Sequence, residues 1–222
     1  MSMLSPYGKY PGCTKAFSLI ELLVVLAIIA ILIGISAPSI SGVMRGYQLE
    51  TAGQVVVNQL TLARQTALSG NRAVQVWFYQ LPDNNQPFSA TPTVYRAMQA
   101  FAEGDPVSAG SSALKAITKP VFLPSPVIFS TTLSPNAVSP LLTSVTATSG
   151  NGSAVVLPGY QQNFNYVVLR FKSNGSTNLD SASSNLTMVV ENDKADTSTG
   201  LPRNYRTLSI DPIIGTVRTY RP

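Results

Sequence analysis

A continuous apolar stretch from Phe17 to Ala37, interrupted only by Glu21, constrains this chain more than any other part of its sequence. At about 1.5 Å per residue, a helix of this length spans the hydrocarbon core of a bilayer, which is about 30 Å thick. A secretory signal peptide has a shorter apolar stretch, of about 7 to 15 residues, followed by a cleavage site with small residues. We therefore predict a membrane-spanning helix over residues 17–37 that persists in the mature protein.

The distribution of charge around this stretch predicts its orientation. Lys9 and Lys15 precede it, and no positive charge follows until Arg45. Because positively charged flanks stay on the cytoplasmic side of a membrane, the N-terminus should be cytoplasmic. We expect a single-pass membrane protein with most of the chain on the outer side of the membrane.

Glu21 is an anomaly inside this apolar stretch. An isolated carboxylate at the centre of a bilayer costs about 2.5–3.5 kcal/mol even on lenient insertion scales. Two explanations are open: the carboxylate reaches the lipid headgroups near the end of the helix, or it has a charged partner.

The short basic leader, Phe17, and the acid four residues later resemble the class III signal of type IV prepilins and pseudopilins. The resemblance implies that a membrane prepilin peptidase removes residues 1–16 by cutting between Ala16 and Phe17, where the family usually has Gly before the cut. It also implies N-methylation of Phe17. Glu21 would then neutralise the terminal ammonium group of a neighbouring subunit during assembly.

Residues 38–71 predict a second, amphipathic part of the helix. Pro38 removes a backbone donor and should kink or locally melt the helix. Gly70 and Asn71 suit a left-handed cap and should end it. Between these limits, apolar residues recur at steps of three and four, as on one face of a helix, namely Ala52, Val56, Leu60, Ala63 and Ala67.

From Ala73 onward the apolar period changes to two, which predicts half-buried strands. The fold class is therefore α+β, a pilin-like arrangement in which a long N-terminal helix packs on the antiparallel sheet of a head over residues 72–222. The last two strands should form a hairpin, and residues 134–152 and 192–204 should be loops. The strands are expected at 74–79, 94–101, 121–123, 127–133, 166–172, 186–191, 205–210 and 216–220.

Further stretches of the sequence resemble particular groups of pilin-like proteins. Residues 62–76 resemble the helix-to-strand passage of the minor pseudopilins of the type II secretion protein H and FimT group, and residues 170–175 and 210–222 resemble elements that close that group. Residues 76–87 and the same C-terminal segment are similar to the Verru_Chthon cassette protein D family of prepilin-like proteins.

Composition argues against an enzyme. The chain has no histidine, which excludes Ser-His-Asp and Cys-His catalysis, and its single cysteine, Cys13, excludes an internal disulfide and a thiolate zinc site. A calcium site formed by Glu191, Asp193 and Asp196 is an alternative, but such acidic loops are more often solvated. We expect no cofactor and no metal.

These observations favour a structural minor pilin or pseudopilin subunit of a type IV pilus or a type II secretion-like pseudopilus. Its partners would be the prepilin peptidase, other pilin or pseudopilin subunits and the inner membrane, and the assembled fibre could be extracellular. One alternative is a single-pass membrane protein that never polymerises. Another is DNA capture, because some FimT-like members bind DNA through basic C-terminal residues. The candidate DNA contacts, more often simply solvated arginines, are Arg203, Arg206, Arg218 and Arg221.

Overall fold

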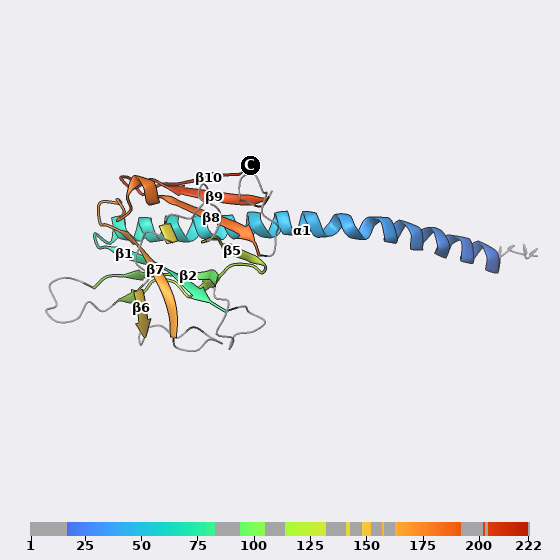
Figure 1. Ribbon diagram of the computed structural model, residues 1–222, viewed down its shortest axis with the longest axis horizontal. Coiled ribbons are helices and arrows are strands. Elements are labelled where there is room, and N and C mark those ends of the chain that lie inside the picture. The colour runs from blue at the N-terminus through green and yellow to red at the C-terminus, as the bar shows by residue number, and fades with distance from the viewer. Residues whose placement is uncertain are drawn as a thin grey trace, which may run out of the picture. The chain divides into compact units, whose positions relative to one another are not determined.

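The computed structural model describes residues 17–82, 94–104, 114–131, 141–142, 148–151, 157, 163–191, 202 and 204–221. The chain forms two compact units, Met1–Val43 and Met44–Pro222. The described part of the first unit is helical, and the second unit combines the rest of that helix with an antiparallel sheet (Figure 1).

Helix α1 extends over Leu19–Ser69. Ser18 precedes it, and the Ser18 carbonyl accepts the first intrahelical hydrogen bond, from the Leu22 amide at 3.2 Å. Serine is favoured at such a cap position. At the other end Asn71 adopts a left-handed conformation with φ of 45°. The Arg72 amide donates to the Ala67 carbonyl at 3.3 Å, the six-to-one bond of a Schellman cap. The predicted end of the helix is confirmed.

Pro38 does not interrupt α1. The helical conformation continues through this residue and through Gly42, so the predicted local melting is wrong. A proline removes one hydrogen bond from the ladder, and the intact turns on both sides can hold the remaining backbone in place.

In the second unit α1 packs its apolar stripe against the sheet. The five residues predicted for this stripe are fully buried, and Leu49 extends it by a further turn with 2% exposure. They share one hydrophobic core with side chains from several strands, including Val76, Leu169 and Leu208. The predicted α+β architecture, a helix packed on an antiparallel sheet, is confirmed.

The sheet is antiparallel throughout, with the strand order β10-β9-β8-β5-β2-β1-β7-β6, while β3 and β4 pair with β2 beside this path. The strands are β1 (Val74–Leu81), β2 (Val94–Ala102), β3 (Lys115–Ala116), β4 (Val121–Phe122), β5 (Val127–Phe129), β6 (Thr148–Asn151), β7 (Asn163–Phe171), β8 (Asn185–Val190), β9 (Tyr205–Ile210) and β10 (Val217–Tyr220). A 3₁₀ turn, η1 (Ser181–Ser183), precedes β8.

Most predicted strands are present within a few residues of their expected bounds, including the terminal hairpin of β9 and β10. The sequence missed β3 and β6, and β6 lies in the segment 134–152 that was predicted to be a loop. β6 has the sequence Thr-Ser-Gly-Asn, which carries a turn signal, and it is a strand because its backbone pairs with β7. Most of the second predicted loop, 192–204, lies outside the described residues.

Strand β1 is buried on both faces, not on one as predicted. Val76 and Phe78 face the core beneath α1. On the opposite face Trp77 and Tyr79 belong to a second hydrophobic cluster. Trp77 stacks on Tyr166 of β7, with ring centroids 4.1 Å apart and planes 3° apart. Because β1 lies between β2 and β7, its outer face is covered by their side chains.

Candidate functional site

The N-terminal part of α1 presents an almost continuous apolar surface. Its large apolar side chains between Phe17 and Ile33 are between 45% and 82% exposed. Glu21 lies in the first turn of the helix and is also exposed. The helix dipole favours a negative charge at this end. Among the described residues, Glu21 has no ion-pair partner, so the charge remains available to another molecule.

The other residues of the predicted N-terminal signal are only partly described. Ala16 lies outside the described residues, and Pro38 lies within the helical ladder of α1. Among the residues that the structure describes, no helix is both long enough and apolar enough to cross a membrane. The membrane-spanning helix predicted over residues 17–37 is therefore not confirmed.

Arg206, one of the candidate DNA contacts, is largely buried in the structure. It is 8% exposed, and its guanidinium donates a hydrogen bond to the Glu50 carboxylate of α1. This bond lowers the pKa of Glu50, and a second bond, from the Gln54 amide at 3.2 Å, acts in the same direction. Sequence reasoning failed here because Glu50 and Arg206 are far apart in the chain and meet only after β9 packs beside α1.

Gly53 makes room for this ion pair. A Cβ atom at residue 53 would lie 2.5 Å from both Cδ and Nε of Arg206. No real Cβ contact is that short, so the arginine lies across the helix only because residue 53 has no side chain.

The remaining candidate DNA contacts are only partly described. Arg203 lies outside the described residues, whereas Arg218 and Arg221 are exposed. Arg221 lies beside α1, where a guanidinium nitrogen would be 3.9 Å from a Cβ at Gly46, and its charge also lowers the pKa of Glu50. Of the three candidate arginines that the structure describes, Arg206 is therefore buried in an ion pair, and Arg218 and Arg221 are exposed.

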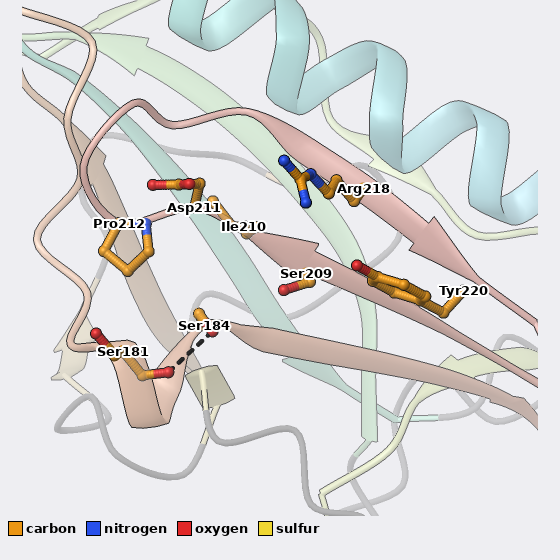
Figure 2. Close-up of a pocket in the computed structure, with 8 residues that line it drawn as sticks. All are labelled: Ser181, Ser184, Ser209, Ile210, Asp211, Pro212, Arg218 and Tyr220. Carbon is orange, nitrogen blue, oxygen red and sulfur yellow. Dashed lines mark hydrogen bonds between the residues drawn. The ribbon is translucent and has the colours of Figure 1, made fainter.

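A polar pocket of about 210 Å³ lies on the C-terminal hairpin (Figure 2). Strands β9 and β10 and turn η1 form it, and its lining includes Arg218, a candidate DNA contact. The polar residues that line it are Ser181, Ser184, Ser209, Asp211, Arg218 and Tyr220. Its three serines come from segments that no sequence motif connects.

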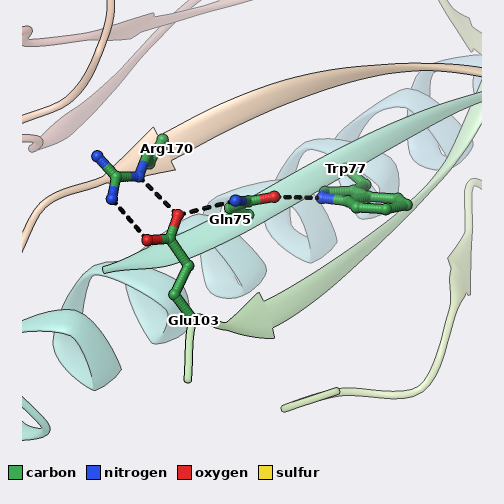
Figure 3. A network of polar contacts seen from close by, with 4 residues as sticks. All are labelled: Gln75, Trp77, Glu103 and Arg170. Atoms are coloured by element: carbon green, nitrogen blue, oxygen red, sulfur yellow. Dashed lines mark hydrogen bonds and ion pairs between the residues drawn. The ribbon is translucent and has the colours of Figure 1, made fainter. Parts of the chain in front are cut away.

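A second polar cluster connects three neighbouring strands on the face of the sheet away from α1 (Figure 3). Glu103 follows β2, and its carboxylate accepts two hydrogen bonds from the Arg170 guanidinium of β7, at 2.6 and 2.5 Å. The Gln75 amide of β1 donates to the same carboxylate at 2.8 Å, and its oxygen accepts the Trp77 indole N–H at 2.9 Å.

This cluster joins the three strands through hydrogen bonds between their side chains. The Arg170 guanidinium holds the pKa of Glu103 below its usual value, and the bond from Gln75 contributes in the same direction. A carboxylate kept ionised by a bidentate arginine is a strong acceptor and a poor proton donor. Nearby, burial raises the pKa of Tyr79, so its hydroxyl stays protonated.

The calcium alternative gains no support from the described residues. Glu191 pairs with Arg96 at 3.4 Å, whereas Asp193 and Asp196 lie outside the described residues. Within the described parts of the chain, no group of three or more acidic or cysteine side chains could hold a metal ion.

The family model for the prokaryotic N-terminal methylation motif matches residues 13–37. No curated protein matches the chain. Two solved structures of the minor pseudopilin EpsH from the type II secretion system of Vibrio cholerae are similar at 11% and 13% identity. Both have a TM-score of 0.40, and each alignment covers 79% of this chain and 98% or 94% of EpsH. The type IV minor pilin FimU of Pseudomonas aeruginosa has 17% identity and a TM-score of 0.35, with 79% of this chain and 89% of FimU covered.

Structural likenesses at such low identity and TM-score carry no argument about function. The narrower resemblance to the Verru_Chthon cassette protein D family stays a prediction. The methylation motif is a match to the sequence alone, independent of the structural likenesses. It includes Phe17 and Glu21, the residues that carry the resemblance to a prepilin signal. The chain therefore carries a prokaryotic N-terminal methylation motif, which confirms the predicted type IV pilin-like N-terminus.

Proposed function

We propose that this protein is a structural minor pilin or pseudopilin subunit that assembles through its N-terminal helix. The observation that carries the proposal is the methylation motif at residues 13–37. The exposed apolar surface of α1 supports it, because a large exposed apolar surface marks a site of contact with other proteins or with a membrane. The described residues of the head form a sheet packed on α1, and no reaction centre is identified among them.

In this proposal a prepilin peptidase cuts between Ala16 and Phe17 and methylates the new terminus. Before assembly, the apolar N-terminal segment anchors the subunit in the cytoplasmic membrane, with the head on the periplasmic side. During assembly this segment enters a bundle of equivalent helices, where Glu21 meets the terminal ammonium of a neighbouring subunit. Such a partner would offset the cost of burying the carboxylate.

Processing is tested by co-expressing the chain with a prepilin peptidase and determining the N-terminus by mass spectrometry. We expect loss of residues 1–16 and a methyl group on Phe17. Ala16→Gly serves as the matched variant, and it should be cleaved at least as completely. An intact leader, or a terminus at another position, would contradict the proposal.

Assembly is tested separately by Glu21→Ala and Glu21→Asp, with crosslinking between subunits as the readout. Replacement by Ala removes a charge from the apolar segment, so membrane association and cleavage should persist while crosslinks to other subunits are lost. Replacement by Asp keeps the charge and should retain part of the assembly. Wild-type crosslinking by Glu21→Ala would show that the protein does not assemble through this carboxylate, in favour of the non-polymerising alternative.

DNA capture ranks below the structural role because Arg206 is buried in an ion pair with Glu50. Arg218 and Arg221 are the predicted contacts that remain exposed among the described residues. Two phosphate contacts would give only a shallow salt dependence of binding.

A further inference from the structure

The polar pocket on the C-terminal hairpin has hydrogen-bonding groups that the fold itself does not use (Figure 2). Among the described residues, the Arg218 guanidinium and the hydroxyls of Ser209 and Tyr220 have no hydrogen-bond or ion-pair partner. The Ser184 hydroxyl donates to the Ser181 carbonyl at 3.1 Å, which orients it beside the pocket. Donors and acceptors therefore converge on one small volume.

Asp211 supplies a fixed acceptor at the edge of this pocket. One of its carboxylate oxygens accepts the backbone amides of Ile213 and Ile214, at 2.9 and 3.1 Å. These bonds hold the side chain in place at the start of the β9–β10 turn. Its second oxygen has no partner among the described residues, so it can accept a hydrogen bond from a ligand hydroxyl.

The mixture of groups identifies the chemistry that the pocket would bind. A carboxylate acceptor, a guanidinium donor and several hydroxyls together match a molecule rich in hydroxyl groups, because each hydroxyl both donates and accepts. Tyr220 is 54% exposed and offers an aromatic ring for contact with an apolar face of such a molecule. The carboxylate of Asp211 would repel a phosphate or a nucleic-acid backbone.

The volume limits the size of the ligand. Pockets for drug-sized molecules typically have volumes of about 300–1,000 Å³. The pocket here, at about 210 Å³, has room for a single ring, and the rest of a larger ligand would lie outside it. We propose that this pocket binds one neutral hexose unit of a glycan, which would attach the head to a glycan-bearing surface.

The inference is independent of filament assembly, because all the groups that form the pocket lie in the second unit. It is tested with the full, unassembled chain in a detergent that carries no sugar headgroup, since a glycoside detergent would compete. Binding of neutral hexoses, of a hexuronate and of a single-stranded oligonucleotide is measured by saturation-transfer NMR and calorimetry.

We expect saturable binding of at least one neutral hexose, with a Kd on the order of 1 mM. Arg218→Gln and Ser209→Ala should each weaken this binding by up to about tenfold, because each removes a hydrogen-bonding group from the pocket. Thr219→Ala is the matched control, since Thr219 is exposed on the same strand but does not line the pocket. The fluorescence of Trp77 verifies that each variant is folded.

Three results would overturn the proposal. The first is the absence of saturable binding of any neutral hexose by the folded wild-type chain. The second is binding that Arg218→Gln and Ser209→Ala leave unchanged. The third is preferential, salt-sensitive binding of the oligonucleotide that both Arg218→Gln and Arg221→Gln reduce, because this pattern indicates attraction of a polyanion to the exposed arginines.

Discussion

Helix α1 contains two apolar regions with opposite surroundings. The large apolar side chains between Phe17 and Ile33 are 45–82% exposed, whereas those of Leu49, Val56 and Leu60 are at most 2% exposed. The first region is an almost uninterrupted apolar stretch, whereas the second carries its apolar residues on one face of the helix. The apolar face of the second region packs against the sheet of the same chain. One helix therefore stabilises the head through its second region and exposes a large apolar surface in its N-terminal region.

The largest expected effect is on the buried region. Leu60→Asp places an unpaired charge in the core and should destabilise the head by more than the roughly 2–5 kcal/mol typical of Leu→Ala at a buried site. Unfolding of the full chain in detergent can be followed through Trp77, the single tryptophan, which is in the head. Leu62→Asp is the control on the same helix, because Leu62 is 39% exposed. Equal melting temperatures for the two variants would contradict the comparison.

A smaller effect is expected where Arg206 crosses α1. Gly53→Ala should improve helix propensity by about 1 kcal/mol, but its Cβ would displace Arg206 from Glu50. Displacement would leave the Arg206 guanidinium, 9% exposed, without its carboxylate partner. A buried donor without a partner costs about 1–3 kcal/mol, so Gly53→Ala should lower the free energy of unfolding.

A double-mutant cycle isolates this coupling. In a chain that already carries Arg206→Ala, the steric conflict is absent, and Gly53→Ala should instead stabilise the head. The test compares the free energies of unfolding of the wild type, of Gly53→Ala, of Arg206→Ala and of the double variant. A change of the same sign and size in both backgrounds would show that the glycine is not required by the ion pair.

A third effect concerns pH and the cluster around Glu103. Because its pKa is lowered in the folded state, ionised Glu103 stabilises the head above its unfolded pKa, and this contribution is lost as the pH falls through the folded pKa. The loss should be no more than about 1 kcal/mol, since solvent reaches both partners of the ion pair.

Trp77 reports this titration directly, because its indole N–H is connected to Glu103 through Gln75. Its emission should change on acidification before the head unfolds. Glu103→Gln should remove the change, whereas Glu191→Gln, which alters the separate pair with Arg96, should leave it intact. An identical acid response in Glu103→Gln would assign the titration to another group.

The smallest effect on stability is expected in the exposed region of α1. Leu26 is 58% exposed, so Leu26→Asn should change the free energy of unfolding of the head by no more than about 0.5 kcal/mol. The same variant should reduce crosslinking between subunits, with membrane association measured in parallel. A large loss of head stability would show that this region also supports the fold of a single chain.

Local patterns predicted much of the fold. The apolar stripe on α1, the left-handed Asn71 and the bounds of β9 were all predicted correctly. They depend on the three- and four-residue spacing along a helix and on the conformational preferences of single residues. The burial of β1 on both faces was not predicted. Alternation along a strand says which side chains share a face and nothing about what covers that face.

The candidate sites also differ in whether the sequence alone could locate them. The methylation motif is a contiguous signal, so the sequence alone located it. The pairing of Arg206 with Glu50, the pocket on the hairpin and the cluster around Glu103 join residues from separate elements. Four arginines near the C-terminus look equivalent in sequence, and only strand pairing decides which of them is buried.

The sequence by itself therefore determined where the helix lies, where it ends and which N-terminal signal it carries, since these properties arise from neighbouring residues. The tertiary structure decided which apolar side chains are buried and which charges are paired. Burial and charge pairing depend on distances between residues remote in the chain, and those distances exist only once the sheet has packed against α1.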